Sequence, residues 1–242
     1  MQLSLFANRN RRESVSVLRC VTRITVRQSI VNGKWASQSK LCYTVFVTDE
    51  CIKRAKTDIE ATSDLLERAL KLSGLVTTLF KEHGFSLVVV GGSAVEFYTE
   101  GGYMSGDVDF CRQSLKAIPL RLMADVMLRL GGKSLGRNWQ VCGIYVDFLG
   151  LLESETILPN RELNTPYGMV YFLPPELALV ERIIFAQTSA ECLPSARQMM
   201  AAALHDERFD WAEARRLADL PDFKVLPLLE TMRKELANGC GA

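Results

Sequence analysis

Residues 88–93 read Val88-Val-Val-Gly-Gly-Ser93, and residues 105–110 read Ser105-Gly-Asp-Val-Asp-Phe110. Three consecutive valines before two glycines predict a buried strand that ends in a turn, followed by a short helix over residues 94–99 that Ser93 can cap. Backbone N–H groups at the start of such a helix, together with the helix dipole, favour a negative charge in front of them. Glycine has no β-carbon, so a phosphate can approach the backbone closely. The first stretch therefore predicts an anion site at Gly91, Gly92 and Ser93.

Two aspartates dominate the second stretch. Asp107 and Asp109 lie two residues apart on a predicted strand, so the period of two places both carboxylates on one face. Adjacent carboxylates repel each other and stay ionised with difficulty unless a cation lies between them. A third acid, Asp147, falls in another strand-like segment, residues 141–149. If the two strands pair, the three carboxylates can hold one or two Mg²⁺ ions, which prefer oxygen ligands.

The order of these elements resembles the polymerase-β-type nucleotidyltransferase superfamily. Gly92-Ser93 matches the family's glycine-serine element, residues 107–110 match its metal-binding strand, and Asp147 matches its third carboxylate. The resemblance covers roughly residues 85–150 and is greatest to small bacterial members, including abortive-infection and toxin-type proteins. It implies transfer of a nucleoside monophosphate from a nucleoside triphosphate such as ATP to an acceptor hydroxyl, with release of pyrophosphate.

The resemblance also implies a role for each site residue. Asp107 and Asp109 would coordinate both magnesium ions, and Asp147 would bind the catalytic ion and help to activate the acceptor. The Gly91–Ser93 segment would hold the triphosphate. The acceptor stays open between RNA or tRNA, a protein side chain and a small molecule.

A degenerate module of the same fold, which binds a nucleotide or a partner protein without chemistry, is the alternative. The tail segment 197–202 motivates it, because it lacks the acids that toxin-type relatives carry after a basic residue. A serine hydrolase is a poorer interpretation. A nucleophile elbow needs glycine two residues after Ser93, where this chain has Val95.

Hydrophobic periodicity predicts an α+β fold in three regions: a basic N-terminal β-hairpin extension (1–52), a core with a small mixed sheet and flanking helices (53–173) and a helical C-terminal region (174–242). The resemblance implies that the middle region is the nucleotidyltransferase core. The hairpin is predicted around the turn Asn32-Gly33. A long helix is expected over residues 54–83, and a strand over 85–90. Further strands are expected over 107–111, 141–149 and 169–173, and helices after Pro119 and Pro174-Pro175 and over 194–205, 210–219 and 224–237.

Charge is distributed unevenly along the chain. Residues 1–48 contain eight Lys or Arg against a single acid, although the whole chain carries a net charge of only +1. Arg19, Arg23 and Arg27 would form a stripe on one face of the hairpin. This stripe could bind RNA phosphates or cover an acidic face of the body.

Other single residues support weaker interpretations. Lys133 and Arg137 are interpreted as solvated loop charges, and Glu96 as a surface or capping residue. Whether Arg182, on the helix after Pro175, reaches a bound nucleotide stays open.

The composition indicates a cytoplasmic protein without a membrane span. No apolar run approaches the length that crosses a bilayer, and the seven cysteines contain no C-x-x-C pair. Neither a zinc site nor a disulfide framework is therefore expected. Cys111 and Cys142 are predicted to be small buried hydrophobic residues on strands.

Overall fold

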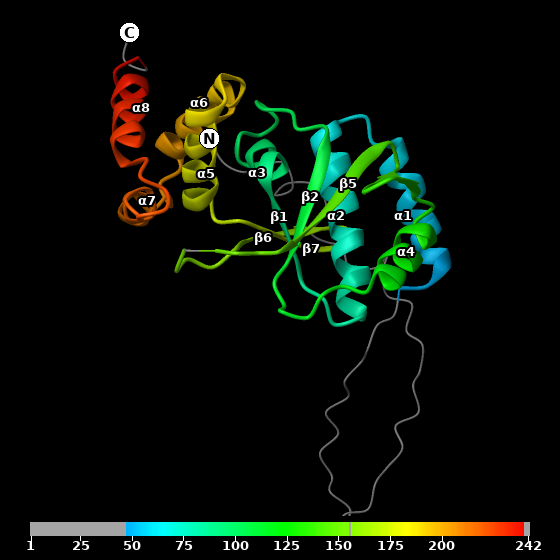
Figure 1. Cartoon of the computed structure of the whole chain (residues 1–242). Coiled ribbons are helices and arrows are strands. Elements are labelled where there is room, and N and C mark those ends of the chain that lie inside the picture. Colours follow the sequence, from blue (N-terminus) through cyan, green and yellow to red (C-terminus); the bar gives the residue numbers. More distant parts are fainter. Residues whose placement is uncertain (1–46, 155, 240–242) are drawn as a thin grey trace, which may run out of the picture.

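The computed structural model describes residues 47–154 and 156–239 (Figure 1). The predicted hairpin, with Arg19, Arg23 and Arg27, lies outside this part of the chain. Within it, no helix is long and apolar enough to cross a membrane.

Helices and a single mixed sheet make up the described chain, which confirms the predicted α+β class. The helices are α1 (Asp49–Ala61), α2 (Leu65–Glu82), α3 (Gly91–Tyr98), α4 (Leu120–Arg129), α5 (Pro175–Thr188), α6 (Leu193–His205), α7 (Trp211–Ala218) and α8 (Leu226–Gly239), with a 3-10 turn at Ala190–Cys192. The strands are β1 (Leu87–Val90), β2 (Asp107–Arg112), β3 (Lys133–Leu135), β4 (Asn138–Val141), β5 (Ile144–Leu151), β6 (Arg161–Thr165) and β7 (Gly168–Phe172). Their order in the sheet is β3-β4-β5-β2-β1-β7-β6.

Hydrophobic cores lie on both faces of this sheet. On one face, α1, α2 and α4 pack against residues such as Val89 and Phe110. On the other, α5 to α8 pack against Val88 and Val90. Figure 1 shows α1, α2 and α4 on one side of the central strands and the α5–α8 group on the other. The continuous valine run of β1 is explained by this double burial, since a strand covered on both faces has no polar side.

The long helix predicted over residues 54–83 is wrong, because the chain forms two helices there. α1 begins at Asp49, where Thr48 accepts a hydrogen bond from the N–H of Cys51, and it ends at Ala61. α2 begins after Asp64, whose carboxylate accepts from the N–H of Glu67 at 2.7 Å. The apolar period continues across the break, which hid these caps. α1 thus spans the predicted regional boundary between residues 52 and 53.

The strand predicted over residues 141–149 is confirmed from residue 144 onward as part of β5, but its start falls in a tight hairpin turn. β4 ends at Val141, β5 begins at Ile144, and Cys142 in the turn has a positive φ of 50°. Cys142 is half-buried in this turn, so its predicted place on a strand is wrong, whereas Cys111 is buried on β2 as predicted. β3 and β6 were not predicted because their sequences, KSL and RELNT, are too short and polar to show alternation.

Candidate active site

The start of α3 lies at the end of β1. The helix begins at Gly91 rather than at Ala94, and Val90 occupies the cap position. The prediction that Ser93 caps the helix is therefore wrong. None of the described side chains caps this terminus, so its first N–H groups are left for another acceptor.

Gly91 approaches the acidic residues closely. It has a φ of +63°, and a β-carbon at this position would lie 2.8 Å from Oδ2 of Asp109. Any larger residue would meet that oxygen and would also be strained in the left-handed region. Glycine is thus required because the first turn of α3 lies beside the Asp109 carboxylate.

Ser93 links the helix to the aspartate strand. Its hydroxyl donates to the carbonyl oxygen of Asp107 and accepts from the N–H of Asp109, each at 3.0 Å. The side chain is only 7% exposed. Since its one proton is already donated to β2, we assign Ser93 to positioning the aspartates rather than to direct donation to a phosphate.

The three predicted carboxylates come from adjacent strands. β2 and β5 run parallel, with Asp109 paired to Asp147 in register. Asp107 lies two residues before Asp109, so all three side chains share one face of the sheet, opposite the buried Val108 and Phe110. Pairing of β2 with β5 therefore brings Asp147 to the same region of the sheet as Asp107 and Asp109, although it lies 38 residues after Asp109 in the chain.

The repulsion among these carboxylates affects the pKa of Asp109. Burial first, and then the neighbouring Asp107 and Asp147 carboxylates, together raise this pKa from its ordinary value of 3.8 to about 6. Arg182 and Arg137 act in the opposite direction. A site that destabilises its own carboxylate in this way favours a cation, because a positive ion removes the repulsion.

Protein groups hold the other two carboxylates. Oδ2 of Asp147 lies 3.1 Å from Nη2 of Arg137, and Oδ1 accepts from the N–H of Phe148 at 2.8 Å. Oδ1 of Asp107 accepts a short hydrogen bond from the hydroxyl of Ser105. Between residues 47 and 239, residue 155 aside, no three Asp, Glu, His or Cys side chains form a ready-made metal-binding group.

The donor set nevertheless fits magnesium in kind. Magnesium takes hard oxygen ligands such as carboxylates. Here the carboxylates lie on one face of the sheet beside a helix N-terminus, and they repel one another. To bind the ion through Oδ2, Asp147 would have to release its ion pair with Arg137.

Two residues play a larger part than the sequence indicated. Arg137 was predicted to be a solvated loop charge, but it pairs with Asp147. Glu96 was predicted to lie on the surface or to cap a helix, but it is 7% exposed and accepts from the N–H of Ser105 at 2.9 Å. Glu96 thereby fixes the loop whose serine contacts Asp107. A hydrophobic period could not have indicated either contact, since both depend on tertiary approach.

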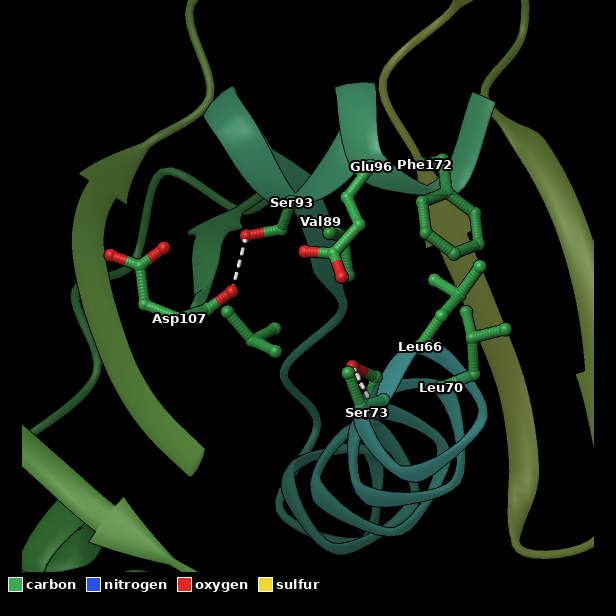
Figure 2. A pocket seen from close by; sticks show the side chains of 10 residues that line it. Leu66, Leu70, Ser73, Val89, Ser93, Glu96, Asp107 and Phe172 are labelled. Carbon is green, nitrogen blue, oxygen red and sulfur yellow. Dashed lines mark hydrogen bonds between the residues drawn. The ribbon is translucent and has the colours of Figure 1, made fainter. Parts of the chain in front are cut away.

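A small cavity lies behind the carboxylates, between α2, α3 and the sheet (Figure 2). Leu66, Leu70 and Phe172 form its apolar side, and it has room for no more than about one water molecule. Figure 2 shows the Asp107 carboxylate directed away from these side chains. The cavity is therefore a packing space behind the site and not a nucleotide pocket.

Comparison with known proteins gives similarity in structure only. The chain matches no protein-family model and no curated protein. A nucleotidyltransferase-like protein from Paracoccidioides brasiliensis is 14% identical, with a TM-score of 0.46 over 72% of this chain and 94% of that one. ANT(2'')-Ia in complex with adenylyl-2''-tobramycin is 12% identical, with a TM-score of 0.40 over 67% of this chain and 95% of that one. Similarity at this level does not assign the chain to a family.

Proposed function

We propose that this protein is a magnesium-dependent nucleotidyltransferase. The observation that carries the proposal is the in-register pairing of Asp109 with Asp147, with Asp107 on the same face and Gly91 beside Asp109. The reaction would form a bond between an acceptor oxygen and the α-phosphorus of a nucleoside triphosphate. The bond from that phosphorus to pyrophosphate would break, and the acceptor hydroxyl would lose its proton.

Each group of residues contributes a separate part of this chemistry. The uncapped N–H groups of Gly91 and Gly92 would bind phosphate oxygens, aided by the α3 dipole. Ser93 and Ser105 would hold the β2 aspartates in place. Asp107, Asp109 and Asp147 would hold Mg²⁺, which neutralises charge on the phosphates when it is bound.

The first experiment measures nucleotidyl transfer directly. Purified protein is incubated with Mg²⁺ and each α-labelled nucleoside triphosphate, in the presence of RNA, protein and small-molecule acceptor pools. Wild type should release pyrophosphate and label an acceptor. Asp109→Asn, which keeps the shape of the side chain, should abolish labelling. The exposed Asp125 on α4 supplies a matched control, since Asp125→Asn removes a carboxylate from a helix on the other face of the sheet. Labelling that survives Asp109→Asn would overturn the proposed mechanism.

A degenerate binding module is the competing proposal. The Arg137–Asp147 ion pair favours it, because it occupies an oxygen that the metal requires. Such a module would bind a nucleotide or a partner protein without releasing pyrophosphate. Pyrophosphate release that Asp107→Asn abolishes would exclude it.

The acceptor and the branch of the superfamily stay predictions. We propose RNA, with a tRNA end as one candidate, because the residues before Val47 are strongly basic. A chain that lacks residues 1–46 should then bind RNA more weakly and with a smaller salt dependence. Unchanged RNA binding would leave a protein or a small alcohol as the acceptor. Membership of the toxin-like branch and a cytoplasmic location are predicted from the sequence alone.

A further inference from the structure

Arg182 lies on the helix that covers the site side of the sheet. Its helix, α5, packs against α3 and against the core that contains Val88 and Val90. The site carboxylates lie on the sheet face that α5 covers, and the positive charge of Arg182 lowers the pKa of Asp109. Its Cζ atom is 4.8 Å from the ring centroid of Phe185, which supports one side of the guanidinium.

One donor of this arginine, its Nε, has no polar partner among the described residues. Its Nε is buried without a hydrogen-bond acceptor, and the side chain forms no ion pair within residues 47–154 and 156–239. Arg137, by contrast, already has Asp147 as its partner. A buried donor left without an acceptor is unfavourable and needs an explanation, of which a missing ligand is one.

The guanidinium group of Arg182 indicates which kind of ligand would suit it. A guanidinium presents planar, paired N–H donors that match two oxygens of a phosphate. The uncapped start of α3 lies beside the same carboxylate, since Gly91 approaches Asp109. One set of anion donors, at the start of α3, therefore lies beside Asp109, and a second, on α5, acts electrostatically on the same carboxylate.

We propose that Arg182 binds the phosphate chain of the nucleoside triphosphate from α5, while the first turn of α3 binds it from β1. This inference rests on the proposed function and adds a phosphate-binding residue from the C-terminal region. A partner with a carboxylate, or a role in packing alone, is an alternative that the experiment separates.

Calorimetric titration with inorganic tripolyphosphate and with the nucleoside triphosphate that wild type uses, both with Mg²⁺, tests the assignment. Arg182→Met should weaken binding of both ligands by the same factor, roughly 10- to 100-fold, because one bidentate charged contact is lost. Binding of the unphosphorylated nucleoside should not change. Arg197→Met is the matched control, since it removes a half-exposed arginine that pairs with Glu235 on the neighbouring α6 and α8 helices. The control should bind like wild type.

The outcomes are distinguishable from failure of the proposed function. If wild type transfers a nucleotide but Arg182→Met binds tripolyphosphate normally, only the assignment of Arg182 is overturned. A lower melting temperature with unchanged affinity would show a packing role and would overturn it as well. If wild type binds neither ligand, both proposals fall. Arg182→Gln, which keeps a polar side chain, carries the same test if the methionine variant does not fold.

Discussion

Arg137 Nη2 lies 3.1 Å from Asp147 Oδ2, and the two side chains are 81% and 5% exposed. An exposed arginine thus neutralises a buried aspartate at the place where a metal ion is expected. Solvent weakens such a pair, so its contribution is small, on the order of 1 kcal/mol or less. At a site that binds a divalent cation as proposed, we expect the pair to compete with the ion without preventing its binding.

Removal of this competitor should tighten metal binding. We expect Arg137→Gln to bind Mn²⁺ or Mg²⁺ about two- to fivefold more tightly than wild type in the absence of nucleotide. Calorimetry or Mn²⁺ paramagnetic resonance measures the affinity. Arg54→Gln removes another exposed arginine, paired with Glu50 on α1, and should have no effect. Weaker metal binding in Arg137→Gln would contradict the competition.

Two glycine variants separate the effect of backbone strain from the effect of disturbing the site. Gly91→Ala adds a β-carbon 2.8 Å from the carboxylate, at a φ of +63°. Gly84→Ala meets a similar φ of +80°, but among the described residues no atom lies within 4 Å of the added carbon. Both should lose about 1 kcal/mol of unfolding free energy from backbone strain. Only Gly91→Ala should also lose Mg²⁺-dependent nucleotide binding. Equal binding in the two variants would contradict the role of this approach.

Ser93 offers a second matched pair. Ser93→Ala removes both hydrogen bonds to the β2 backbone and should lower the unfolding free energy by about 1–3 kcal/mol. Ser73→Ala removes a buried serine that only donates to the Ala69 carbonyl within α2, so its cost should be smaller. Urea denaturation measures both. Transferase activity should fall only for Ser93→Ala, and a normal rate in that variant would contradict its positioning role.

Metal binding should depend on pH through Asp109. Its pKa is raised from 3.8 to about 6 on folding, so its ionisation disfavours the folded state. This penalty is absent below pH 3.8 and complete above about pH 6. Mg²⁺ should therefore raise the melting temperature much more at pH 7.5 than at pH 5. Asp109→Asn should remove most of this difference. Burial also raises the pKa of Glu181, to about 7. Because Asp109→Asn leaves Glu181 in place, this variant separates the effect of Asp109 from that of Glu181. A response to Mg²⁺ equal at both pH values would contradict the assignment.

The sequence predicted the main strands of the site because their signals are local. A valine run before two glycines and a period-two pair of aspartates do not depend on distant residues, and β1 and β2 appear where they were expected. The pairing of Asp109 with Asp147 could only be stated as a condition, since the order of strands in a sheet follows from tertiary packing.

The parts that the sequence did not predict depend on contacts between segments. Arg137 lies in the turn after β3, a three-residue, exposed, polar strand that shows no hydrophobic pattern. The hydroxyl of Ser93 serves a neighbouring strand and not its own helix, because the cap position falls on Val90. Ser and Thr hydroxyls are predicted as caps by local rules, and such rules do not account for a strand that lies beside the helix.

β7 joins the two halves of the molecule more closely than a division at residue 173 suggests. The N–H of Leu173 donates to the carbonyl oxygen of Val89, so the chain enters α5 directly from a strand beside β1. A fragment that ends at residue 173 would expose Val88 and Val90 to solvent. It would also lack α5, which covers the site side of the sheet. The smallest piece of this protein able to do chemistry should therefore include the C-terminal helices, and shortening it from that end should yield an insoluble product instead of a minimal enzyme.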